Sequence, residues 1–101
     1  MKRWGWVLFT VCALGACVSA PPPVDEYTLA RAALDAARSV ESARFSPGYW
    51  HQAEDSYRRG QSLYKDHEYL QAKTEFVKAR IAAERAENST RLIRQKNGEI
   101  L

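Results

Sequence analysis

Residues 69–93 read YLQAKTEFVKARIAAERAENSTRLI, and in this stretch apolar or small side chains recur at alternating steps of three and four. The members of the series are Tyr69, Ala72, Phe76, Ala79, Ala83, Ala86, Thr90 and Ile93. Side chains at these steps share one face of an α-helix, and an unbroken series of them is typical of a helix-packing seam. The pattern predicts one long helix over residues 68–96, ended at Asn97-Gly98 because glycine commonly follows the last helical turn.

A second helix is predicted before it, from Pro47 to about residue 64. Ser46 is a candidate N-cap, proline fits the first helical position, and Phe45 with Trp50 matches a hydrophobic staple. Its stripe is Trp50, Ala53, Tyr57, Gly60 and Tyr64. Because glycine weakens a helix interior, we expect Gly60 to lie against a neighbouring backbone. Asp66, in the turn at residues 65–67, is the expected cap of the long helix.

The first helix is predicted over residues 25–44. Its apolar face is formed by Leu29, Ala33, Ala36, Val40 and Ala43, at steps of four, three, four and three. These side chains are mostly alanine, so a neighbouring helix can approach closely. The fold class is therefore all-α, an antiparallel hairpin or bundle of three helices with a long C-terminal helix.

The long helix exceeds the other two by roughly 10–15 Å at about 1.5 Å per residue. Its excess length is expected to project beyond the bundle. This overhang carries the candidate partner-binding residues Arg91, Leu92, Ile93, Arg94 and Lys96. An unpaired apolar stripe with a basic edge is a plausible docking surface, and a frayed, solvated end is the open alternative.

The N-terminus has the layout of a secretory signal, with Lys2-Arg3 before an apolar run over residues 4–14. The sequence Leu14-Gly15-Ala16-Cys17 resembles the lipobox of bacterial lipoproteins. The resemblance implies that Leu14, Gly15 and Ala16 are recognised by the lipoprotein signal peptidase and that Cys17 is acylated. The alternative is an uncleaved membrane helix over residues 4–20, which is short for that role.

Four segments follow from this interpretation: a signal peptide at 1–16, an acylated cysteine with a proline-rich tether at 17–24, a helical domain at 25–97 and a tail at 98–101. Val18 follows the cysteine. By resemblance to lipoprotein-sorting systems, where Asp at that position favours inner-membrane retention, we expect the inner leaflet of an outer membrane, facing the periplasm.

Composition excludes several functions. Without Lys2 and Arg3 the chain keeps 13 of its 15 Lys and Arg against 12 Asp and Glu, so no nucleic-acid partner is expected. His51 and His67 are interpreted as solvated, because metal sites need three or four converging ligands. No catalytic residue, metal site or cofactor is predicted, since no nucleophile has a partner set and no Gly-rich phosphate loop is present.

Two resemblances bear on the helical domain. Gly60-x2-Leu63 and Tyr69-x2-Ala72-x3-Phe76-x2-Ala79 resemble one tetratricopeptide unit, but Ser56 and Glu84 stand where tryptophan and proline are usual. The Ala-rich first helix, Arg44-Phe45-Ser46-Pro47-x2-Trp50-x2-Ala53, and the alanines of the long helix resemble the bacterial envelope family called domain of unknown function 4398. That resemblance implies a lipoprotein with a short tetratricopeptide-like domain and no assigned catalytic residue.

Two function classes remain open. The first is a non-enzymatic lipoprotein, an adaptor or structural component of the cell envelope that binds an unidentified envelope protein, with a homo-oligomer as a further possibility. The second is a cell-wall binder or an accessory subunit of an envelope enzyme, contacting glycan or peptide through aromatic and basic side chains. The first is favoured because the sequence offers packing faces and no site.

Overall fold

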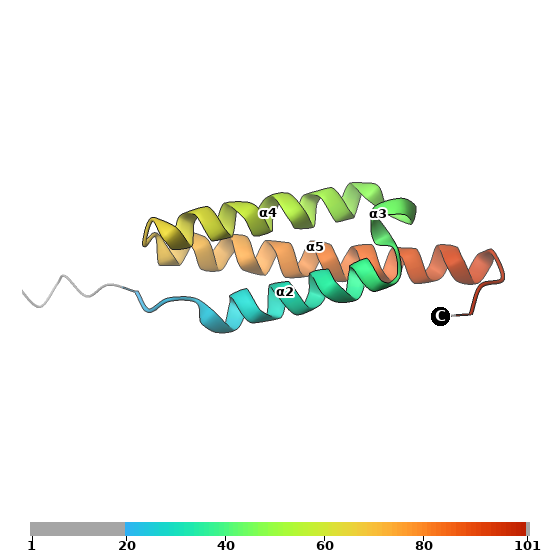
Figure 1. Ribbon diagram of the computed structural model, residues 1–101, viewed down its shortest axis with the longest axis horizontal. Helices are drawn as coiled ribbons and strands as arrows, with labels where there is room; N and C mark the ends of the chain where they lie inside the picture. The colour runs from blue at the N-terminus through green and yellow to red at the C-terminus, as the bar shows by residue number, and fades with distance from the viewer. Residues whose placement is uncertain (1–19, 101) are drawn as a thin grey trace, which may run out of the picture.

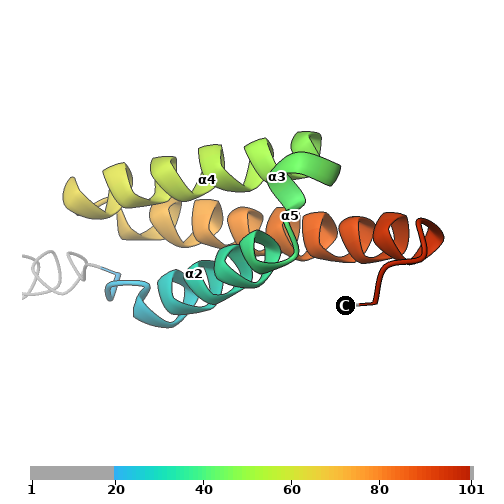
Figure 2. The ribbon, with the colours of Figure 1, turned by 45° about the vertical axis from the view of Figure 1, so that its right-hand side comes forward.

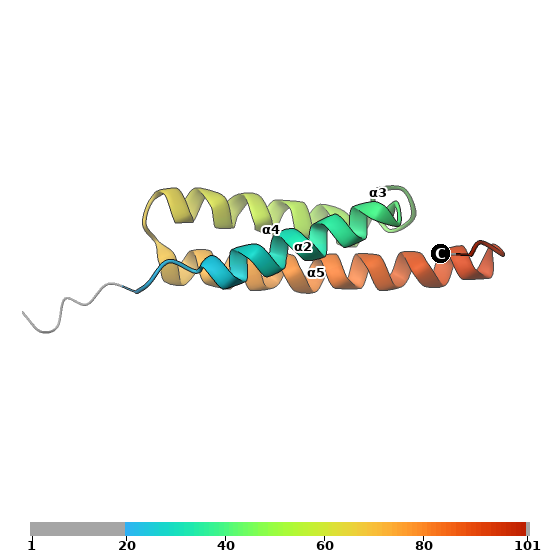
Figure 3. The ribbon, with the colours of Figure 1, turned by 60° about the horizontal axis from the view of Figure 1, so that its bottom comes forward.

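The computed structural model describes residues 20–100, which are all-helical and contain no strand. This part of the chain forms four helices, whose arrangement Figure 1 shows. They are α2 (Val24–Ser39), α3 (Ser42–Phe45), α4 (Pro47–Lys65) and α5 (Tyr69–Lys96). α2 and α5 run in the same direction and α4 runs opposite to both (Figures 1 and 3). The all-α class and the long C-terminal helix were predicted correctly.

α5 is the central element of the fold. α2 and α4 each lie along it, and they contact each other far less than either contacts α5 (Figure 2). The predicted stripe of α5 lies at the centre of the core: Ala72, Phe76, Ala79, Ala83, Ala86 and Thr90 are fully buried. Tyr69 and Ile93, at its two ends, are half-buried. The small alanine side chains let both neighbouring helices approach α5 closely.

The buried face of α2 differs from the predicted one by a single position. Ala30, Leu34 and Ala37 are buried, whereas Leu29 is 54% exposed. One position corresponds to a rotation of about 100° about the helix axis. The observed face places Tyr27 and Leu34 against the other helices. It therefore buries larger apolar side chains than the predicted face, which was mostly alanine.

The prediction of one helix through residue 44 is wrong. α2 ends at Ser39, and Glu41 adopts a left-handed backbone conformation with φ 66° before α3 begins. This turn directs Ser42 into the core, where it is fully buried, and leaves Ala43 exposed. The break therefore lets α3 cross the end of the bundle and cover α5 near Thr90.

The helix caps follow the sequence only in part. Pro47 does occupy the start of α4, but the Ser46 side chain forms no cap hydrogen bond. Asp66 is the C-cap of α4, and Glu68 precedes α5, so Asp66 does not cap the long helix. Backbone hydrogen bonds from His67 to Tyr64 and from Glu68 to Leu63 close the α4–α5 turn instead. Glycine-like φ at His67 (60°) makes that reversal tight.

The overhang of α5 is shorter than predicted, because Ala86 packs in the core with Leu34, Ala37 and Trp50, and Thr90 contacts Ser42 and Ser46. Only the last turns of α5 project beyond the other helices (Figure 1). Within residues 20–100, no helix has the length and apolar character needed to cross a membrane.

Candidate functional site: the groove between α2 and α4

A groove runs along α5 between α2 and α4, and three aromatic rings from the three helices form its floor. The Tyr27 ring meets Phe76 edge-on at 5.3 Å between centroids and stacks on Tyr57 at 5.8 Å. Tyr57 and Phe76 lie 5.9 Å apart at a tilted angle. We call these three residues the aromatic floor. Such ring pairs contribute about 0.5–1.5 kcal/mol each beyond their buried area, so the floor also holds α2 against α4 and α5.

The two phenols of the floor interact. Burial, followed by the contact with Tyr27, raises the pKa of Tyr57 to about 12. The Tyr57 hydroxyl lowers the pKa of Tyr27 from its ordinary value, and Arg31 adds to this effect against the opposing influence of burial. The direction of the shift shows that burial disfavours the phenolate of Tyr57, so a negative charge on this part of the floor is unfavourable.

At one end of the groove lies a cavity of about 370 Å³, which we call the tether-end pocket. Its lining is mainly apolar and comes from all three long helices: Val24, Tyr27, Gln61, Tyr64, Lys65 and Phe76. Val24 is the first residue of α2 and Lys65 the last of α4, so the pocket opens where residues 20–23 enter the bundle (Figure 1).

The middle of the groove is polar. A second cavity of about 360 Å³ is lined by Arg31, Leu34, Asp35, Arg38, Glu54, Tyr57, Arg58 and Gln61. Most of these charges neutralise one another, since Arg38 pairs with Asp35 at 2.8 Å and Arg58 with Glu54 at 3.3 Å. Ion pairs this exposed contribute little to stability. Arg31 has no ion-pair partner among residues 20–100, so it is the cation that this cavity offers to a ligand.

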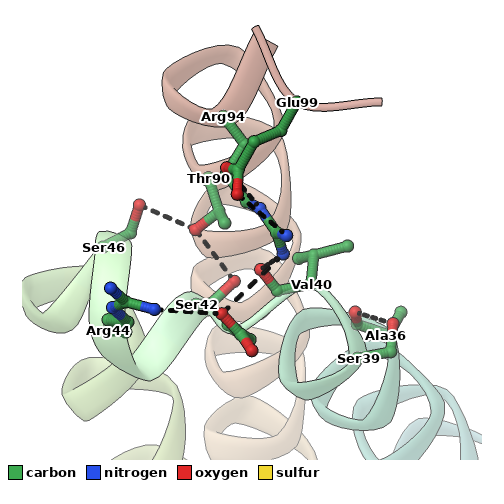
Figure 4. Close-up of polar contacts among 10 residues, drawn as sticks. Ala36, Ser39, Val40, Ser42, Arg44, Ser46, Thr90, Arg94 and Glu99 are labelled. Atoms are coloured by element: carbon green, nitrogen blue, oxygen red, sulfur yellow. Dashed lines mark hydrogen bonds and ion pairs between the residues drawn. The ribbon is translucent and has the colours of Figure 1, made fainter. Parts of the chain in front are cut away.

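The opposite end of the bundle is fixed by a buried polar cluster (Figure 4). The Thr90 hydroxyl of α5 lies 2.9 Å from Ser46 Oγ and 3.1 Å from Ser42 Oγ. Arg94 Nη1 donates to the Val40 carbonyl at 2.9 Å, and Arg94 Nε donates to Glu99 at 2.9 Å. These bonds tie the α2–α3 turn to α5 and leave the hydroxyls without access to solvent.

The five predicted partner-binding residues do not form one surface. The Arg94 side chain is only 17% exposed and lies between the Val40 carbonyl, Glu99 and the Phe45 ring. Ile93 is half-buried. Arg91 pairs with Glu87 at 3.7 Å, while Leu92 is 60% exposed and Lys96 is exposed. The hydrogen bond from Arg94 to the Val40 carbonyl joins segments far apart in the chain, so the sequence pattern did not indicate it.

The remaining residues considered in the sequence analysis are those of the lipobox and the two histidines. Cys17, Leu14, Gly15 and Ala16 lie outside the described residues. His51 lies 3.9 Å from Glu54, and the His67 ring packs against Tyr69 at 5.5 Å between centroids. From residue 20 to residue 100, no three His, Cys, Asp or Glu side chains come close enough together to hold a metal ion.

The groove itself was not predicted, because the face of the first helix was assigned through Leu29 rather than Tyr27. The signal that could have revealed it is Tyr27, which lies three residues before Ala30 and seven before Leu34 and so shares a helix face with them.

Comparison with known proteins gives a family and nothing more specific. No curated protein and no solved structure is significantly similar to the chain. Residues 25–98, which cover nearly all of α2 to α5, match one family model. The chain therefore belongs to the family described as Domain of unknown function (DUF4398).

Proposed function

We propose that this protein is a lipid-anchored, non-enzymatic adaptor of the bacterial cell envelope, attached through acylated Cys17 to the inner leaflet of an outer membrane and facing the periplasm. The lipobox-like Leu14-Gly15-Ala16-Cys17 supports the anchor. The arrangement of the helices supports the orientation: residues 20–23 enter at the end of the bundle that carries the α4–α5 turn, and α5 extends toward the other end (Figure 1). An anchored domain would therefore present the C-terminal end of α5 to the periplasm.

The observation that carries the adaptor role is an apolar stripe on the outer face of α5. Leu70 is 71% exposed, Ile81 37% and Leu92 60%. They follow one another at intervals of eleven residues, close to three helical turns or about 16 Å, so they lie along the same side of α5. Ile81 also lines a cavity formed with α4. Exposed large apolar side chains spaced along one side of a helix support docking of an amphipathic partner helix, which would contact α5 at several turns.

The tetratricopeptide-like interpretation belongs to the same proposal. α4 and α5 form an antiparallel pair joined by a short turn, and Gly60 meets Phe76 where the two helices touch. α2 packs on α5 rather than extending a regular array. α2 therefore covers one face of the α4–α5 pair, and the opposite face is left for a single partner.

A non-enzymatic role is supported by how the reactive groups are used. The hydroxyls of Ser42, Ser46 and Thr90 are buried and bonded to one another, at the end of the bundle remote from the tether-end pocket. The carboxylates that line the groove, Asp35 and Glu54, are paired with arginines. The buried hydroxyls stabilise the end of the bundle, and the carboxylates are engaged by arginines, so no nucleophile has a base beside it in the described groove.

Anchoring is tested with Cys17→Ala and acyl-chain labelling in cells. We expect the wild type to take the label and to fractionate with the outer membrane, because several acyl chains at about 0.8 kcal/mol per buried methylene make release negligible. The Cys17→Ala variant should take no label and leave the membrane fraction. A variant that stays in the outer membrane, beside an unlabelled wild type, would exclude the lipid anchor.

Docking on α5 is tested with a photo-crosslinking side chain placed at Ile81 or Leu92 in cells. Leu29 is a matched control, because it is 54% exposed and apolar but lies on α2. We expect the two α5 positions to crosslink to the same envelope protein and Leu29 to give no such product. Equal products from all three positions, or none from the α5 positions, would contradict the adaptor proposal.

One observation favours the alternative function, a cell-wall binder. The groove presents Tyr27 and Tyr64 together with Gln61 and Arg31, side chains that can stack on sugars and hydrogen-bond to them. Co-sedimentation with purified cell wall tests this function. Retention by the wild type that is lost in Arg31→Ala would support it.

A further inference from the structure

The tether-end pocket combines an apolar interior with a single cation. Val24, Tyr27 and Phe76 supply apolar wall, and Lys65 lies among the lining residues. Val24 is 56% exposed, so apolar surface continues from the pocket to the outside. Lys65 is exposed and has no carboxylate within salt-bridge distance among residues 20–100. An apolar cavity with an unpaired cation among its lining residues matches a ligand that has an apolar chain and an anionic head.

The position of the pocket indicates where that ligand comes from. The pocket is lined by Val24 at the start of α2 and Lys65 at the end of α4, so it lies at one end of the bundle. Residues 20–23 enter the bundle at that end (Figures 1 and 2). A proline-rich segment spans about 3.1 Å per residue, so the chain from Cys17 to Pro23 reaches roughly 20 Å. Leu70, at the start of α5 and thus at the same end, is 71% exposed. An anchor on Cys17 would hold this end close to the surface of a bilayer.

We propose that the tether-end pocket binds an acyl chain of a membrane phospholipid, with the phosphate group on Lys65. This inference rests on the proposed lipid anchor. The cavity of about 370 Å³ is many times the roughly 30 Å³ that one water occupies in the liquid, so it admits a length of hydrocarbon chain but not a whole lipid. Binding there would press the bundle end onto the membrane and fix the direction in which α5 points.

The experiment uses the full acylated protein in vesicles of phosphatidylethanolamine and phosphatidylglycerol whose acyl chains carry bromine, which quenches tryptophan fluorescence on contact. After loss of the signal peptide, Trp50 is the only tryptophan of the three in the chain. It lies in the first turn of α4 and is 6% exposed, so the wild type is the unquenched control. In the Trp50→Phe/Tyr64→Trp variant we expect the pocket tryptophan to lose most of its emission.

A matched pair of variants separates pocket binding from mere proximity to the membrane. Val24→Asp introduces a carboxylate into the pocket wall at the N-terminus of α2, where negative charge is favourable, so folding should be unaffected. Leu29→Asp introduces the same charge on the same helix at a site of nearly equal exposure that does not line the pocket. In the single-tryptophan background, Val24→Asp should restore the emission and Leu29→Asp should not.

The outcomes distinguish the inference from the proposal on which it rests. A chain that takes no acyl label and does not float with vesicles contradicts the lipid anchor. A chain that is acylated and floats, but whose pocket tryptophan is not quenched or is quenched equally in Val24→Asp and Leu29→Asp, overturns the inference alone. If the tryptophan variant does not fold, amine labelling of the wild type decides: vesicles should protect Lys65 and not Lys78, and equal labelling overturns the inference.

Discussion

The Phe76 ring occupies the space where a side chain on Gly60 would lie. A Cβ built on Gly60 would be 2.6 Å from Phe76 Cε1 and 2.7 Å from its Cδ1, closer than real Cβ contacts come. Phe76 is fully buried and its ring contacts those of Tyr27 and Tyr57, so a displaced ring would disturb both contacts. Gly60 therefore does lie at a close contact between α4 and α5, but the predicted neighbour was wrong: it is the Phe76 side chain and not a backbone.

Gly60→Ala should destabilise the fold. Overpacking a core costs about 1–3 kcal/mol of unfolding free energy. Replacing glycine by alanine inside a helix gains about 1 kcal/mol in helix propensity, so we expect the cost to exceed the gain. Gly48→Ala is the control, because a Cβ there meets no atom within 4 Å and should leave stability unchanged or raised. Urea unfolding of both variants measures the difference. A Gly60→Ala variant as stable as Gly48→Ala would show that Phe76 gives way.

Thr90→Val should cost about 1–3 kcal/mol of unfolding free energy, the penalty for leaving a buried hydroxyl without a partner. The substitution keeps the shape of Thr90 but removes the oxygen that lies between Ser42 and Ser46. Thr74→Val is the matched control, because Thr74 is exposed and its hydroxyl donates only to the Leu70 carbonyl within its own helix. Equal urea midpoints for the two variants would contradict a stabilising role for the cluster.

The sequence predicted α5 well and α2 poorly, for a physical reason. In α5 one stripe repeats over the whole helix, so its core face is unambiguous. In α2 two stripes one residue apart, through Leu29 and through Ala30, both follow helical spacing. Which one is buried depends on Tyr57 and Phe76, which belong to other helices and whose rings meet Tyr27. A choice made by tertiary contacts cannot be read from the spacing within one helix.

The polar end of the bundle was hidden from the sequence for the same reason. Ser46 has the ideal position for a cap, yet its hydroxyl bonds to Thr90, 44 residues further along the chain. Glu41 adopts a left-handed backbone conformation that its residue type does not favour. In the resulting turn, the Val40 carbonyl accepts a hydrogen bond from Arg94. Arg94 therefore became a structural residue, whereas its charge near the chain end had indicated a docking surface.

Arg94→Ala should loosen the α2–α3 turn. The guanidinium donates to the Val40 carbonyl and lies 5.3 Å from the centre of the Phe45 ring, so its loss frees both. We expect faster hydrogen exchange at the amides of α3, while α4 keeps its protection. Arg91→Ala is the control, because Arg91 pairs only with Glu87 on its own helix. Unchanged exchange in α3 would show that the turn holds without Arg94.

The interaction of Tyr57 with the aromatic floor should be visible in alkaline titrations. The phenol keeps its proton to about pH 12 in the folded protein, against about 10.0 for an ordinary tyrosine. Followed by phenolate absorbance, one of the five tyrosines should ionise later than the rest, and Tyr57→Phe should remove that late step. A titration in which the variant loses an ordinary step instead would contradict the buried position of this hydroxyl.

The same shift sets the direction of a stability change. Between pH 10 and pH 12 the folded state holds the Tyr57 proton that the unfolded chain releases, so the contribution is complete below pH 10 and is lost as the pH rises through about 12. The lowered pKa of Tyr27 acts in the opposite direction. The Tyr27→Phe variant keeps Tyr57, whose raised pKa makes the unfolding free energy fall as the pH rises. The Tyr57→Phe variant lacks that phenol, so in urea unfolding between pH 10 and pH 12 its unfolding free energy should fall less steeply. The reverse order would mean that Tyr27 is the phenol that burial keeps protonated.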